Sequence, residues 1–181
     1  MPATSTELIT RYLQQAITAE RSFEAQLRGF AQDGDDEEVQ STFAAHAVQT
    51  AQQIERLTER LKELGGEPQQ EESELTLFRE VSPKFSGPAV PEERIAQNLI
   101  AAYAAEAMEC ALYEVLAAIA GANGDTATER LARDLQRQEH TTAARVWHFL
   151  PSRSKIAFNM LTIDEIDPSV ETRTLGNRLV E

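Results

Sequence analysis

The chain has 181 residues, with 17 Lys or Arg against 30 Asp or Glu, so its formal net charge is −13 at pH 7. This length and a hydrophobic content of 41% predict one soluble domain with a substantial core. The acidity argues against nucleic acid and anionic membranes as partners. The single cysteine excludes an internal disulfide and any cysteine-based zinc or iron–sulfur site within one chain.

The N-terminal residues lack the basic and apolar regions of a signal peptide, so we expect a cytoplasmic protein. The longest apolar run, residues 99–119, contains Glu106, Glu109 and Glu114. Because carboxylates are costly in a bilayer, the run predicts a buried helix and no membrane span.

Four long helices are predicted from segments rich in good helix formers, each with an apolar stripe at a period of 3.6 residues. In chain order they span residues 5–32, 36–64, 91–120 and 126–149. Gly65 is a suitable C-cap for the second helix, Pro91 suits the first position of the third, and Asp125 is a suitable N-cap for the fourth. The fourth helix is expected to end before Pro151.

The connections between these helices predict the topology. The first two helices and the last two are joined by short links, which favour antiparallel hairpins. The link over residues 65–90 is much longer, and such a loop is unusual unless it crosses the bundle. We therefore expect an all-α, ferritin-like antiparallel four-helix bundle over residues 1–150. A short helix is expected at residues 71–78, and residues 151–181 are expected to form a C-terminal extension that begins with a short helix.

Polar residues interrupt the apolar stripes at a similar depth in all four helices. Glu20 lies on the stripe of the first helix, Glu106 and Glu109 on the third, and Glu139 on the fourth. The second helix carries four polar residues at this depth, which are His46, Gln49, Thr50 and Gln53. Any one of these Glu residues could reach solvent from the edge of its stripe. Their occurrence at one depth on three helices favours a shared inner site, in which each carboxyl is protonated, hydrogen-bonded or metal-bound.

Carboxylates that converge in a bundle core are typical of di-iron and di-manganese proteins. A complete di-iron site has a Glu from two helices and a Glu-x-x-His pair from each of the other two. Here Gln49 takes the place of a Glu on the second helix, and Thr142 follows Glu139 where a His would be needed. The expected ligands of a partly degenerate site for iron or manganese are Glu20, Glu106, Glu109 and Glu139, with His46 as a further candidate.

The histidines offer less specific signals. For His46, a role in helix packing with a hydrogen bond is the alternative to metal binding. His140 follows Glu139 directly and lies about 100° around the helix, so it is expected to point away from the site. His148 lies near the predicted helix end, where a contact with solvent or with the helix dipole is expected.

At these residues the sequence resembles the YciE/YciF-like family of ferritin-like bacterial stress proteins. The matching residues are 17–21, 43–46, 50, 53–57, 63–68, 99–102, 105, 106, 109, 113, 135, 139 and 142. The resemblance implies a ferritin-like bundle, commonly dimeric, with a carboxylate site between the helices. It also implies that Glu20, Glu106 and Glu139 are the inward Glu residues of the family, and that Glu109 is a second acidic position on the third helix. Gln49 stands where the family usually has Glu, a departure that bears on two-metal chemistry.

Two main functions follow as hypotheses. The favoured one is binding of iron or manganese in a homodimer or larger homo-oligomer, where bound iron would permit ferroxidase-like or peroxide-consuming chemistry. The alternative is a metal-free structural bundle whose inner Glu residues are protonated or bonded to Gln49, Gln53, Tyr103 or Tyr113. A partner-binding role for residues 151–181 is compatible with both, and the sequence leaves open whether the protein is an enzyme.

Overall fold

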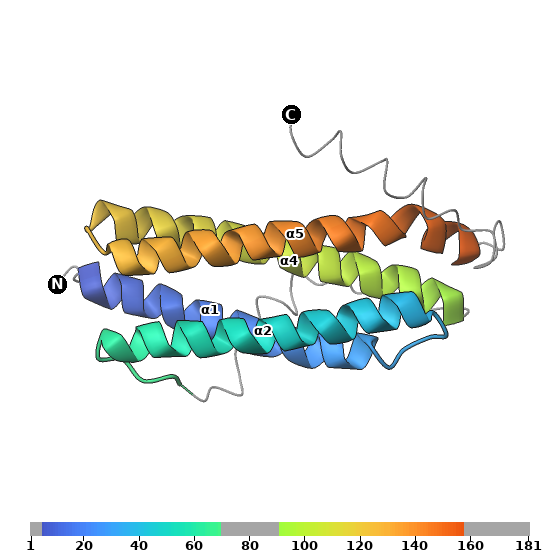
Figure 1. Cartoon of the computed structure of the whole chain (residues 1–181), viewed down its shortest axis with the longest axis horizontal. Coiled ribbons are helices and arrows are strands. Elements are labelled where there is room, and N and C mark those ends of the chain that lie inside the picture. The colour runs from blue at the N-terminus through green and yellow to red at the C-terminus, as the bar shows by residue number, and fades with distance from the viewer. Residues whose placement is uncertain (1–4, 70–90, 158–181) are drawn as a thin grey trace.

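The computed structural model describes residues 5–69 and 91–157 (Figure 1). It contains the helices α1 (Ser5–Phe30), α2 (Glu37–Glu63), α4 (Pro91–Ala122) and α5 (Thr126–Ala157), and no strand occurs within these residues. The predicted all-α fold is therefore confirmed. The short helix expected at residues 71–78 and the C-terminal extension beyond residue 157 lie outside the described residues.

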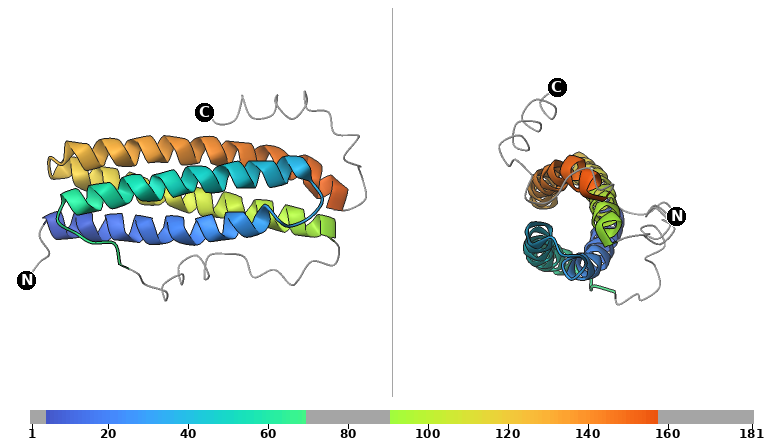
Figure 2. Two further views of the ribbon diagram at one scale, coloured as in Figure 1. Left: turned by 60° about the horizontal axis from the view of Figure 1, so that its bottom comes forward. Right: turned by 90° about the vertical axis from the view of Figure 1, so that its right-hand side faces the viewer.

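The helices form two antiparallel hairpins that lie side by side along the long axis of the molecule (Figure 1). In the end-on view they follow one another in the order α2, α1, α4 and α5 (Figure 2, right). The contacts between α1 and α2, α1 and α4, and α4 and α5 are extensive, whereas α2 and α5 contact each other much less. None of the helices in the described part is long and apolar enough to cross a membrane.

Local signals fix most of the helix ends close to their predicted positions. Asp36 caps α2, because its carboxylate accepts a hydrogen bond of 3.1 Å from the backbone N–H of Val39. Gly65 follows α2 with a φ of 79°, a left-handed conformation that favours glycine. Asp125 accepts a bond of 3.0 Å from the N–H of Thr128 at the start of α5.

The predicted end of the fourth helix before Pro151 is wrong, because α5 continues through this proline to Ala157. Proline lacks an N–H and usually ends or kinks a helix. The additional turns place Arg153 in the interior, where its guanidinium donates from Nε to Asp36 at 2.7 Å and from Nη2 to Glu38 at 2.9 Å. An ion pair between residues far apart in sequence thus extends the helix past the position where the local rule predicts its end.

The core consists of two apolar clusters, one toward each end of the bundle. The first includes Phe23, Leu27, Phe43, Leu99, Val146 and Phe149. The second includes Leu13, Ile17, Leu57, Tyr113, Leu116 and Leu135. Near the middle of each helix, buried polar residues lie between or next to the members of these two clusters, as Glu20, Gln53, Glu109 and Glu139 do. The fold therefore holds a polar layer at mid-length that apolar side chains cover on both sides.

We expect Arg153→Ala to destabilise the protein by about 3–5 kcal/mol, because it leaves the buried Asp36 carboxylate without its ionic partner. The free energy of unfolding from urea denaturation measures the effect. Arg137→Ala is the matched control, since that side chain lies on the same helix and is 69% exposed. Similar stabilities for the two variants would contradict a structural role for the Asp36–Arg153 pair.

Candidate metal centre

The polar layer contains the four Glu residues that the sequence singles out. Glu20 comes from α1, Glu106 and Glu109 from α4, and Glu139 from α5, and none of them is more than 1% exposed. His46 from α2 is 4% exposed. All five candidate ligands therefore lie in the interior, at the middle of the bundle.

His46, Glu106 and Glu139 form the tightest group within this layer. One potential ligand atom of each residue lies within 4.8 Å of those of the other two. His46 Nε2 is 2.9 Å from Glu106 Oε1. The His46 ring also meets the ring of Phe23 edge-on, with 5.2 Å between their centroids. One imidazole and two carboxylates from three different helices thus face a common point.

Glu20 and Glu109 flank this group without joining it. Tyr113 donates its phenolic hydrogen to Glu20 Oε1, whereas Glu20 Oε2 has no hydrogen-bond partner among the described residues. Both carboxylate oxygens of Glu109 also lack a hydrogen-bond partner in this part of the chain. The two flanking residues therefore bring additional oxygen atoms that the surrounding protein does not fully satisfy.

Burial opposes the ionisation of the inner carboxyls by raising their pKa values. It is the largest influence on Glu139, where it acts together with repulsion from Glu106 and raises the pKa to about 9. Burial likewise raises the pKa of the other three inner Glu residues well above the ordinary value. In the opposite sense, burial and then the charge of Arg145 lower the pKa of His46 to about 4. Near neutral pH His46 is therefore uncharged, which is the form that binds metals.

The structure changes the interpretation of the second helix. Gln49 is only partly buried, and its amide donates to Thr142 Oγ1 at 3.4 Å. Thr50 and Gln53 are the residues that point fully inward, at 0% and 1% exposure, and Gln53 donates a hydrogen bond to Glu139. This pair has the same three-residue spacing as Glu139 and Thr142 on α5. The positions at which a Glu-x-x-His pair would face the centre are therefore 50 and 53, and position 49 lies at the edge.

Other polar residues considered in the sequence lie away from the centre. His140 is exposed, and its Nδ1 is 3.5 Å from Cys110 Sγ. The Tyr103 ring contacts the Trp147 ring at a tilt of 51°, with 5.0 Å between the ring centroids. Of the four amide and phenol groups that the sequence offered as partners for the carboxyls, Gln53 and Tyr113 donate hydrogen bonds to them.

The donor atoms of this layer suit a divalent cation. Buried polar atoms are normally hydrogen-bonded, yet Glu20 Oε2, both oxygens of Glu109, Thr50 Oγ1 and His46 Nδ1 have no hydrogen-bond partner among the described residues. A bound cation would satisfy such atoms and compensate the charge of the carboxylates. Carboxylate oxygen and imidazole nitrogen are ligands that iron and manganese accept in ferritin-like bundles. The residues present therefore fit one of these metals.

Comparisons with known proteins agree with this architecture. A family model described as "Domain of unknown function (DUF892)" matches residues 4–157. Among functionally curated proteins, no sequence matches this chain.

Three solved structures illustrate the similarity in fold. The stress protein YciF from E. coli is 21% identical, with a TM-score of 0.64 over 88% of this chain and 98% of that chain. A Dps protein from Vibrio cholerae, described as a member of the ferritin-like diiron-carboxylate superfamily, is 16% identical with a TM-score of 0.68, over 81% and 91%. A dodecameric thioferritin from Bacteroides fragilis is 18% identical with a TM-score of 0.66, over 87% and 92%.

These similarities confirm the ferritin-like fold that the helix order and the long crossover predict. The family model extends over all four helices α1, α2, α4 and α5 and ends where α5 ends. The chain therefore belongs to the family described as a domain of unknown function (DUF892), in agreement with its resemblance to YciF-like proteins.

Proposed function

We propose that the protein binds iron or manganese in the polar layer, with His46, Glu106 and Glu139 as the ligands of the first ion. The convergence of these three side chains, within 4.8 Å of one another in the interior, carries the proposal. Glu20 and Glu109 either complete the coordination of this ion or bind a second one. The description of a structural neighbour as a diiron-carboxylate protein supports the choice of metal.

Residues of this chain would orient the ligands and keep bulk water away. Gln53 holds Glu139 and Tyr113 holds Glu20, each through a hydrogen bond to a carboxylate oxygen. Outer contacts of this kind fix the direction of a ligand and tune its basicity. The apolar clusters cover the layer at both ends. A bound iron ion would supply one-electron redox chemistry, so an oxidase-type or peroxide-consuming activity belongs to this proposal only if iron is the metal.

The alternative function is a metal-free bundle in which the inner carboxyls stay protonated. The same two hydrogen bonds and the raised pKa of Glu139 favour it. The two functions differ in one measurable respect, because only the first requires the carboxyls to exchange their protons for a cation.

We also propose that the protein forms a homo-oligomer. The dodecameric assembly of a structural neighbour supports this proposal, as do the exposed apolar side chains Val48, Val115 and Trp147. The mass in solution, measured by light scattering, tests it, and a monomer at micromolar concentration would contradict it. A stress-related role and a cytoplasmic location remain predictions from the sequence.

Manganese or ferrous iron should bind to the wild-type chain in isothermal titration calorimetry, and Glu106→Gln should weaken the binding at least about tenfold. Glutamine keeps the size of the side chain while it removes a charged ligand. Glu114→Gln is the matched control, since Glu114 lies two turns further along α4 and its side chain is 53% exposed. If the folded wild-type chain binds neither metal and none is found by elemental analysis after purification without chelators, the metal-free function holds instead.

The stability of the metal-free protein should fall as the pH rises from about 6 to 9. A raised carboxyl pKa contributes stability that is complete below the ordinary Glu value and is lost as the pH rises through the folded value, which is about 9 for Glu139. The lowered pKa of His46, about 4, acts only below its ordinary value of 6.5. Manganese displaces the protons, so its stabilising effect should grow over the same range.

Thermal unfolding midpoints at pH 6, 7.5 and 9, with and without manganese, provide the measurement. A midpoint of the metal-free protein that stays constant from pH 6 to 9 would show that the carboxyls are already ionised in the folded state, because no protons are then exchanged on unfolding. Glu139→Gln should flatten the pH dependence, because it removes one of the titrating groups, whereas Glu114→Gln should leave it unchanged.

A further inference from the structure

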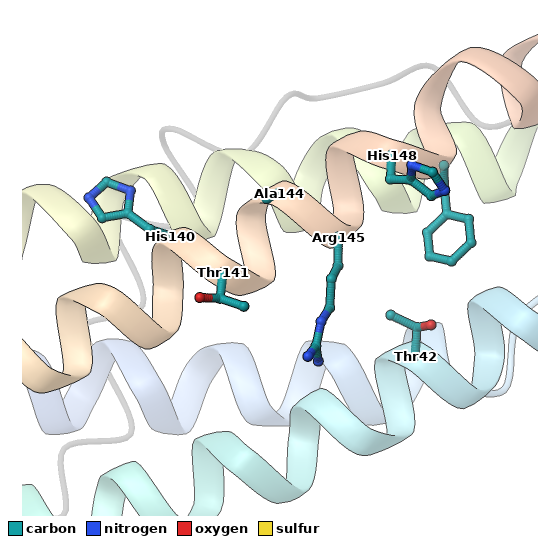
Figure 3. A pocket seen from close by; sticks show the side chains of 7 residues that line it. Thr42, His140, Thr141, Ala144, Arg145 and His148 are labelled. Carbon is teal, nitrogen blue, oxygen red and sulfur yellow. The ribbon is translucent and has the colours of Figure 1, made fainter. Parts of the chain in front are cut away.

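A second feature of the bundle is a pocket between α2 and α5, which contact each other less than the other neighbouring helices do. Its volume is about 590 Å³, which falls within the range of small-molecule sites. Thr42 of α2 forms one wall, and residues of α5 that include Ala144, Arg145 and Phe149 form the other (Figure 3). The α5 residues of the pocket lie within positions 140–149, directly after Glu139 of the polar layer.

The walls of this pocket are mainly apolar. Ala144, Phe149 and His148 supply most of the apolar surface, and the His148 ring meets Phe149 edge-on with 5.8 Å between centroids. The other lining residues beside Arg145 are Thr42, Thr141 and His140. Such walls favour the burial of an apolar or aromatic body. The hydroxyls of Thr42 and Thr141 already donate to backbone carbonyls of their own helices, so a polyanion would find few free donors besides Arg145.

Arg145 introduces one positive charge into these surroundings. In Figure 3 its side chain extends from α5 across the gap toward α2. Within residues 5–69 and 91–157 it has no ion-pair or hydrogen-bond partner, unlike the other arginines of α2 and α5 that bridge the same two helices, Arg56, Arg60 and Arg153. Arg145 is exposed, so its guanidinium is open to an incoming anion at the mouth of the pocket. A guanidinium binds carboxylates through two parallel hydrogen bonds, and this geometry makes it selective for them.

We propose that this pocket binds a monocarboxylic acid with an apolar or aromatic body. The carboxylate pairs with Arg145, and the body lies along Ala144, Phe149 and Thr42. A single cation matches a single negative charge, whereas phosphate would require more donors than these walls provide. The proposal concerns a site outside the five candidate metal ligands, and it holds whether or not a metal ion is bound.

The test is calorimetric titration of the full chain with 2-naphthoate, in protein freed of metal by chelation and then dialysed to remove the chelator, itself a carboxylate. We expect a dissociation constant below about 1 mM. The neutral amide, 2-naphthamide, should bind at least about tenfold more weakly, because it cannot form a charge-assisted pair with Arg145. Inorganic phosphate should neither bind nor displace naphthoate.

Three variants locate the site. Arg145→Gln should weaken naphthoate binding at least about tenfold, while Arg145→Lys should retain part of the affinity. Ala144→Phe should abolish binding by filling the pocket while it leaves Arg145 in place. Arg137→Gln, on the same helix about two turns away, is the control and should bind like the wild type.

Several outcomes would overturn the proposal. Absence of naphthoate binding by the wild type would do so, as would equal affinities for naphthoate and naphthamide, or displacement of naphthoate by phosphate. An unchanged affinity in Arg145→Gln, or an equal loss in Arg137→Gln, would place the ligand elsewhere. Circular dichroism melting of each variant separates loss of the site from loss of the fold. Because the protein is metal-free, failure here is independent of the proposed metal binding.

Discussion

The burial of four carboxyl groups at the middle of an apolar bundle is the constraint on which this structure depends. An isolated charged carboxylate in such surroundings would be very unfavourable, so each group must be protonated, hydrogen-bonded or bound to a cation. The protein meets this need in part, through Tyr113 at Glu20 and Gln53 at Glu139. The oxygens of Glu109 remain without partners among the described residues. The apolar clusters on both sides stabilise the fold and so offset the free-energy cost of burying these carboxyl groups.

The contacts between neighbouring helices are of two kinds, apolar and polar. The pairs α1–α2, α1–α4 and α4–α5 pack through apolar side chains. In contrast, α2 and α5 contact each other mainly through polar side chains. Arg153 joins these two helices at one end, and Arg56 and Arg60 join them toward the other. A polar contact of this kind leaves the layer nearest to solvent along α2 and α5. The pocket beside Arg145 lies along the same contact, so both proposed sites are placed where apolar packing is weakest.

The ligand set differs from a complete di-iron site in a systematic way. Thr50 and Gln53 on α2, and Thr142 on α5, occupy inward positions where a carboxylate or an imidazole would complete two Glu-x-x-His pairs. The layer keeps one imidazole, His46, which lies one turn away from Thr50 on the same face of α2. Fewer anionic and imidazole ligands reduce the positive charge that the layer can hold. For the proposed metal binding, this difference would favour one ion with two flanking carboxylates over two equivalent ions.

Local sequence features were enough to predict the helices, their antiparallel order and the inward direction of the Glu residues. These features follow from the 3.6-residue period, the caps at Asp36, Gly65 and Asp125, and the length of the links, all of which act locally. The 3.6-residue period alone did not show which face of α2 points into the bundle. Gln49 and Thr50 are both polar and only 100° apart, so the choice of the inward residue depends on packing against α1 and α5.

The end of α5 and the presence of the pocket depend on contacts between residues that are far apart in the sequence. Pro151 ends a helix by its local chemistry, but the Arg153–Asp36 ion pair joins residues 117 positions apart and outweighs it. The pocket likewise depends on the distance between α2 and α5, and no local sequence pattern specifies that distance. Local patterns thus indicated most of the inward-facing residues, because periodicity acts within one helix. The rotation of α2, the end of α5 and the pocket depend on contacts between helices, which no local pattern contains.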